Sequence, residues 1–153
     1  MNIKNKMFTA PKHYQSGSLL LEGMVAILIF SLGILGLMAL QAASIRLSDD
    51  ARGRSDAAFL ANKIIGHMWL QDTTALAANY TYNAGVVNNC SAGTSSNSAN
   101  TNVNNWLTKD VATTLPGALP AHQKIAVGAG NNVTVTLCWK APSETDWHRY
   151  TTT

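Results

Sequence analysis

The hydrophobic pattern of the chain is dominated by one run, residues 19–40, in which Glu22 is the only ionisable side chain. A run of this length reaches the roughly 20 apolar residues that an α-helix needs to cross about 30 Å of hydrocarbon. We therefore predict a membrane-spanning helix. A carboxylate well inside a span costs on the order of 3 kcal/mol, so Glu22 either lies at the level of the lipid headgroups or has a partner of opposite charge.

The pattern after Gln41 is more polar but keeps a helical period. Arg52 and Asp56 stand one helical turn apart, where they can pair, and they fall off the apolar face, as does Lys63. We predict that the helix continues to an end between residues 71 and 76 and is on the order of 80 Å long from Ser18. Its apolar stripe, which we expect to seat the chain's own globular domain, consists of Leu47, Ala51, Ala58, Ala61, Ile65 and Met68.

The chain changes character between residues 79 and 105, where it is dense in Asn, Ser, Thr, Gly and Ala. This composition predicts a loop, in which Val86 and Val87 form at most a short strand before Cys90.

A short helix is predicted over residues 105–117, because Leu107, Val111 and Leu115 recur at helical spacing and Pro116-Gly117 follows them. Asn104 or Asn105 is the expected N-cap.

Strand patterns come last, at residues 124–127, 133–139 and 148–152, with a turn at residues 128–132 between the first two. In residues 133–139 the apolar side chains alternate with Thr134, Thr136 and Cys138, which predicts a half-buried hairpin with its apolar face against the long helix. The expected fold class is α+β, with a long N-terminal α-helix packed on a small antiparallel β-sheet.

The formal charge of +3 is unevenly placed along the chain. Lys4, Lys6 and Lys12 precede the apolar run, and removing them leaves 11 − 3 = 8 basic side chains against 8 acidic ones. The basic excess therefore predicts the topology of the chain, with a cytoplasmic N-terminus and the C-terminal body on the other side of the membrane. We expect a membrane as partner and no nucleic acid.

Two cysteines, Cys90 and Cys138, both fall in the portion expected to be exported. A disulfide is the expectation in an oxidising compartment, with two unpaired thiols as the alternative. Neither cysteine has C-x-x-C spacing, and His67, His122 and His148 lack metal-ligand spacing. No catalytic set emerges, so we predict no enzyme, no metal and no cofactor.

The residues around the start of the apolar run resemble a known signal. Gly17, Ser18, three leucines and Glu22, followed by a long apolar helix, are similar to the signal of type IV prepilins, which a membrane peptidase cuts after the glycine before it methylates the new N-terminus. The resemblance implies cleavage after Gly17, methylation of Ser18, and pairing of Glu22 with the N-terminal amine of a neighbouring subunit. Most major pilins begin with Phe, and this chain would begin with Ser18.

Residues 31–41 resemble the S-x-G-x-L-G-L-x-x-L-Q segment of PilV-type minor pilins, and Trp106 with the later Leu115-Pro116-Gly117 resembles an element of their globular part. The resemblance implies a minor pilin that helps to prime type IV pilus assembly and thereby supports twitching motility or adhesion. The implied partners are the prepilin peptidase, other minor and major pilins, a tip adhesin and the inner-membrane assembly platform.

The domain organisation expected on this basis is a leader at residues 1–17, a membrane or filament-core helix at 18–41, its periplasmic continuation at 42–76 and a globular periplasmic domain at 77–153. The location implied is the bacterial inner membrane, and then the pilus. Two alternatives stay open, namely a minor pseudopilin of a type II secretion system and an uncleaved single-span periplasmic anchor protein.

Overall fold

One long helix, α1 (Ser16–Trp69), opens the part of the chain that the computed structural model describes, which is residues 16–71, 73–85, 90–95, 97–142 and 144–153. The chain divides into two compact units, Met1–Arg46 and Leu47–Thr153, and α1 contributes to both. The leader lysines and the predicted Val86-Val87 strand lie outside the described residues.

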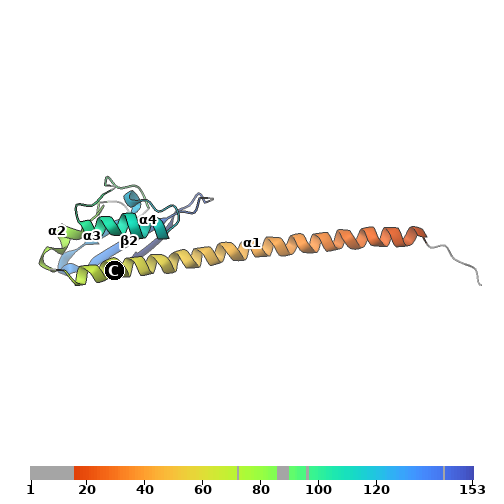
Figure 1. Cartoon of the computed structure of the whole chain (residues 1–153), viewed down its shortest axis with the longest axis horizontal. Coiled ribbons are helices and arrows are strands. Elements are labelled where there is room, and N and C mark those ends of the chain that lie inside the picture. Colours follow the sequence, from red (N-terminus) through yellow and green to blue (C-terminus); the bar gives the residue numbers. More distant parts are fainter. Residues whose placement is uncertain (1–15, 72, 86–89, 96, 143) are drawn as a thin grey trace, which may run out of the picture. The chain divides into compact units, whose positions relative to one another are not determined.

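The second unit contains every other element and has the predicted α+β arrangement (Figure 1). After α1 come η1 (Thr73–Ala75), α2 (Leu76–Tyr80), α3 (Thr101–Asn105), η2 (Trp106–Val111), α4 (Ala112–Thr114), η3 (Pro120–His122), β1 (Lys124–Val127), η4 (Ala129–Asn131), β2 (Val133–Trp139) and β3 (His148–Thr152).

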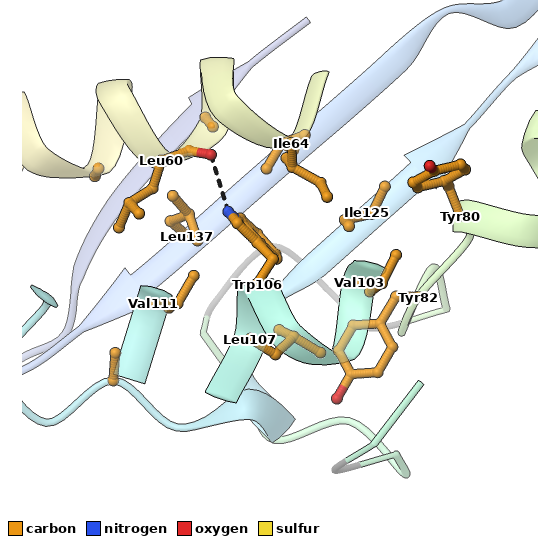
Figure 2. Close-up of a cluster of buried hydrophobic side chains, with 14 of the residues drawn as sticks. Leu60, Ile64, Tyr80, Tyr82, Val103, Trp106, Leu107, Val111, Ile125 and Leu137 are labelled. Carbon is orange, nitrogen blue, oxygen red and sulfur yellow. Dashed lines mark hydrogen bonds between the residues drawn. The ribbon is translucent and has the colours of Figure 1, made fainter. Parts of the chain in front are cut away.

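The three strands form an antiparallel sheet in the order β1-β2-β3. All three begin and end at the residues that the alternation predicts, and Ile125 lies opposite Val135 while Leu137 lies opposite Tyr150. The end of α1 and the helical run α3-η2-α4 lie side by side on one face of this sheet (Figures 1 and 2).

The prediction that β2 is half-buried is wrong, because Thr136 and Cys138 on its other face are buried too. β1 begins at Lys124, opposite Thr136, so the backbone of Cys138 has no strand partner on that side. The Gln123 side chain takes that place: its Nε2 donates to the Cys138 carbonyl and its Oε1 accepts from the Cys138 N–H, each at 2.9 Å. A buried amide thus completes the ladder where the strand stops.

The buried face of α1 is offset from the predicted stripe. Leu47 and Ala51 are exposed and Ile65 is only half-buried, whereas Ala61 and Met68 are buried as expected. The fully buried positions of α1 begin at Gly53, and small residues on the buried face let the sheet approach closely. The buried positions of α1 are Gly53, Ala57, Leu60, Ala61, Ile64 and Met68. The predicted Arg52–Asp56 pair is confirmed at 3.7 Å.

The predicted helix over residues 105–117 begins earlier than expected. Its N-cap is Asn100, whose side chain accepts from the backbone N–H groups of Asn102 and Val103. The middle of the run, η2, is a π-helical turn that carries buried Trp106, Leu107 and Val111. The wider turn lets all three of these large side chains enter the core.

Trp106 joins this helical run to α1, because its indole Nε1 donates to the Leu60 carbonyl at 2.9 Å (Figure 2). Lys63 Nζ lies 2.8 Å from Asp110 Oδ2 and adds an ion pair between the same elements. The core between the helices and the sheet is continuous, with Ile64, Val103 and Leu137 fully buried.

The end of α1 differs slightly from the expected one. The helix stops at Trp69, and the Gln71 N–H donates to the Met68 carbonyl as the chain turns. The expected continuation to residue 76 is therefore broken into the separate short elements η1 and α2.

A substitution at Gly53 tests how closely α1 approaches the sheet. A Cβ at this position would lie 2.9 Å from the indole Nε1 of buried Trp139, so we expect Gly53→Ala to lower the free energy of unfolding by about 1–3 kcal/mol. The measurement is urea unfolding of the full chain in micelles, followed by tryptophan fluorescence.

Gly66→Ala is the matched control, because a Cβ there meets nothing within 4 Å on the same helix. It should leave stability unchanged or raise it by up to about 1 kcal/mol. Equal effects of the two substitutions would contradict the close approach of Trp139 to α1.

Candidate functional site

The first unit, as far as residues 16–46 describe it, is a helix without a buried face. The large apolar side chains of residues 19–40 are 40% to 70% exposed. Among the described residues, α1 is the one helix that is long and apolar enough to cross a membrane by length and composition. Apolar surface of this extent is stable only against lipid or other protein.

The polar groups in this segment are few. The Ser31 hydroxyl donates to the Ile27 carbonyl at 2.6 Å and is satisfied within the helix. Glu22 is different, because the ion pairs and hydrogen bonds of the described residues include none at its carboxylate. No partner for this charge therefore lies among the described residues.

The predicted processing residues lie at the start of the same helix. Gly17 and Ser18 are helical and exposed, and Ser18 is one turn from Glu22 on α1. The helix begins at Ser16 and has no acid in its first turn. In a chain that started at Ser18, Glu22 would be the fifth residue and would lie closer to a helix N-terminus, where a carboxylate is favoured.

The predicted disulfide is confirmed in the second unit. Cys90 is bonded to Cys138 of β2, with their Cα atoms 5.7 Å apart, and both residues are buried. The bridge fastens the Asn- and Ser-rich loop to the sheet. Beside it, His122 Nδ1 lies 2.6 Å from the Cys90 carbonyl oxygen, and the His122 ring stacks on Trp147 at 4.2 Å.

A cluster of polar side chains surrounds His148. The imidazole Nδ1 lies 3.0 Å from Asp50 Oδ1 of α1, and Nε2 lies 2.7 Å from Glu144 Oε2. Arg54 pairs with the other oxygen of Asp50 at 3.2 Å. The Asp50–Arg54 and Glu144–His148 pairs each join residues four apart in the sequence. The Asp50–His148 contact joins α1 to the start of β3 and forms only in the folded chain, so local spacing does not reveal it.

The other candidates are the tryptophans and the possible metal ligands, and two of the tryptophans are core residues. Trp106 and Trp139 are core residues and Trp147 is half-buried, as expected for core or rim positions, whereas Trp69 is 74% exposed. Within the part of the chain that the structure describes, no group of three or more His, Cys, Asp or Glu side chains could hold a metal ion.

Comparison of the chain with protein-family models, with curated proteins and with solved structures finds no match. A functional assignment therefore rests on the exposed apolar residues 19–40, on Glu22 as the one carboxylate among them and on the residues that precede this run.

The disulfide provides a test of the second unit. The two cysteines are separated by 48 residues, so removing the bridge in Cys90→Ser/Cys138→Ser should lower the free energy of unfolding by about 4 kcal/mol in the chain-entropy model. Urea unfolding in micelles with and without a phosphine reductant measures the difference. The reductant should destabilise the wild type and leave the double variant unchanged, and a wild type indifferent to the reductant would contradict the bridge.

Proposed function

We propose that this chain is a type IV minor pilin of the PilV kind. It is made as a prepilin, cut after Gly17 by the prepilin peptidase, and held in the inner membrane by residues 18–41. It then joins other minor and major pilins, with the assembly platform and a tip adhesin as further partners, and helps to prime pilus assembly for twitching motility or adhesion. The observation that carries the proposal is the Gly17-Ser18 pair one turn before Glu22, at the head of a helix whose apolar surface is exposed.

Charge pairing explains the four-residue spacing between Ser18 and Glu22. Cleavage after Gly17 creates an amine on Ser18, and in an apolar filament core a neighbouring subunit's amine neutralises the Glu22 carboxylate. An unpaired charge in such a core is heavily penalised, whereas a pair is tolerated and selects one register between subunits. The absence of a partner for Glu22 among the described residues supports this role.

The second unit supports export. Its disulfide is expected in an oxidising compartment, and the basic residues before the apolar run favour a cytoplasmic N-terminus. Together they favour a single-pass inner-membrane protein with a periplasmic domain, which becomes part of the pilus after assembly. The polar second unit supplies contacts rather than catalysis in this account.

A deletion strain separates this proposal from the pseudopilin alternative. Loss of surface pili with normal secretion of exoproteins is the expected phenotype. Loss of exoprotein secretion with intact pili would instead assign the chain to a type II secretion system.

Gly17→Ala tests the cut position. The peptidase requires the glycine in the proposed signal, so most of the variant should keep its leader and migrate more slowly than wild type on a denaturing gel. Gly23→Ala is the matched control, since this glycine lies beyond the cut and a Cβ there meets nothing within 4 Å. Normal processing of Gly17→Ala would support an uncleaved anchor whose N-terminus has another role.

Glu22→Gln tests charge pairing without changing side-chain shape. The variant should be cut normally, yet its fraction in sheared pili should fall at least about tenfold, because the amine of the neighbouring subunit then lacks a partner. Asp49→Asn is the control, as Asp49 is exposed on the same helix but outside the apolar run. Wild-type incorporation of Glu22→Gln would count against the pairing.

A further inference from the structure

A cleft of about 330 Å³ opens in the second unit, beside the segment that follows α2 and beside residues 95 and 97–100. Ten described residues line it and none of them carries a charge; eight have amide or hydroxyl side chains and the other two are alanines. The proposed assembly role does not use this cleft, which lies wholly within Leu47–Thr153.

One group of lining residues holds the walls in place. Tyr82 exchanges two backbone hydrogen bonds with Ile125 of β1, at 2.8 and 2.9 Å. Its hydroxyl donates to the Ser95 carbonyl at 2.7 Å, which ties the sheet edge to the loop. Asn83 spans the same gap, because its Nδ2 donates to the Ser95 carbonyl and its Oδ1 accepts from the Ser95 N–H.

Asn100, another lining residue, is fixed as well, because its side chain is occupied as the N-cap of α3. The walls are therefore formed before any ligand arrives, which lowers the ordering cost of binding. Burial raises the pKa of the Tyr82 phenol above its ordinary value, although the Asn83 side chain opposes the shift. The phenol therefore stays neutral at pH values at which an ordinary tyrosine begins to ionise.

A second group of lining residues is not used by the fold. Asn79, Thr81 and Asn97 are exposed in the cleft, and the hydrogen bonds among the described residues include none from their side chains. Each amide offers both donors and an acceptor, and the Thr81 hydroxyl offers one of each. The cleft thus combines a rigid frame with three unengaged polar side chains.

We propose that this cleft binds a neutral saccharide of about one or two sugar rings. Sugar hydroxyls both donate and accept hydrogen bonds, which matches the amides of Asn79 and Asn97 and the hydroxyl of Thr81. A charged ligand would find no opposite charge among the lining residues, and an apolar ligand would find only two alanines. The volume lies at the small end of ligand sites, which limits the size of the sugar.

The test is an NMR titration of the full chain in micelles of a detergent without a sugar headgroup, such as lauryldimethylamine oxide. The side-chain amide signals of Asn79 and Asn97 are followed while maltose, lactose, cellobiose or chitobiose is added, with anionic sialyllactose as comparison. At least one neutral disaccharide should give saturable shifts of these signals below about 10 mM, and sialyllactose should bind at least tenfold more weakly.

Substitutions of the lining residues test whether the sugar binds in this cleft. Asn79→Ala and Asn97→Ala should each weaken it about tenfold, as expected for one lost hydrogen-bonding side chain. Thr81→Val removes the hydroxyl with little change of shape and should also weaken it. Asn102→Ala is the matched control, because Asn102 is exposed and does not line the cleft. Failure of all four neutral disaccharides to saturate, equal binding of sialyllactose, or equal binding by the cleft variants and Asn102→Ala would each overturn the proposal.

Discussion

The exposed apolar surface of residues 19–40 is the constraint on which the rest of the account depends. The described residues of the first unit offer this surface no protein partner, and its large side chains are 40% or more exposed. At roughly 25 cal/mol for each Å² of apolar surface, water is an untenable environment for such a helix. Lipid satisfies the apolar side chains, and Glu22 then lies at the level of the headgroups or needs a partner of opposite charge.

In the second unit, only the later part of α1 is buried against other elements of the same chain. Gly53 and Ala57 allow close contact with the sheet, and Trp106 bonds across to the Leu60 carbonyl. The disulfide and the Gln123 amide complete the outer face of β2. A domain fastened in this way has a core of its own, which leaves the apolar segment available to lipid or to neighbouring subunits.

Much of this fold could be predicted from the sequence, because the patterns involved are local. Alternation fixed the bounds of β1, β2 and β3, and the Arg52–Asp56 pair follows from one helical turn. The disulfide was predictable because two cysteines in a body that is expected to be exported have few alternatives.

The errors arose where distant partners decide the outcome. The buried face of α1 depends on where the domain begins to cover it, and a stripe defined by larger apolar side chains overlooked Gly53. Gln123 is buried because β1 begins only at the next residue, opposite Thr136, and Asp50 meets His148 only through tertiary structure. The polar cleft was read as a loop, since composition alone does not show which amides are left unengaged.

The central claim is that cleavage after Gly17 creates the amine that Glu22 pairs with. Mass spectrometry of the N-terminal peptide, from protein purified out of membranes of wild-type cells that contain the prepilin peptidase, tests it most directly. The account predicts a peptide that begins with methylated Ser18. A peptide that begins at Met1, or that still contains Lys4, would contradict it.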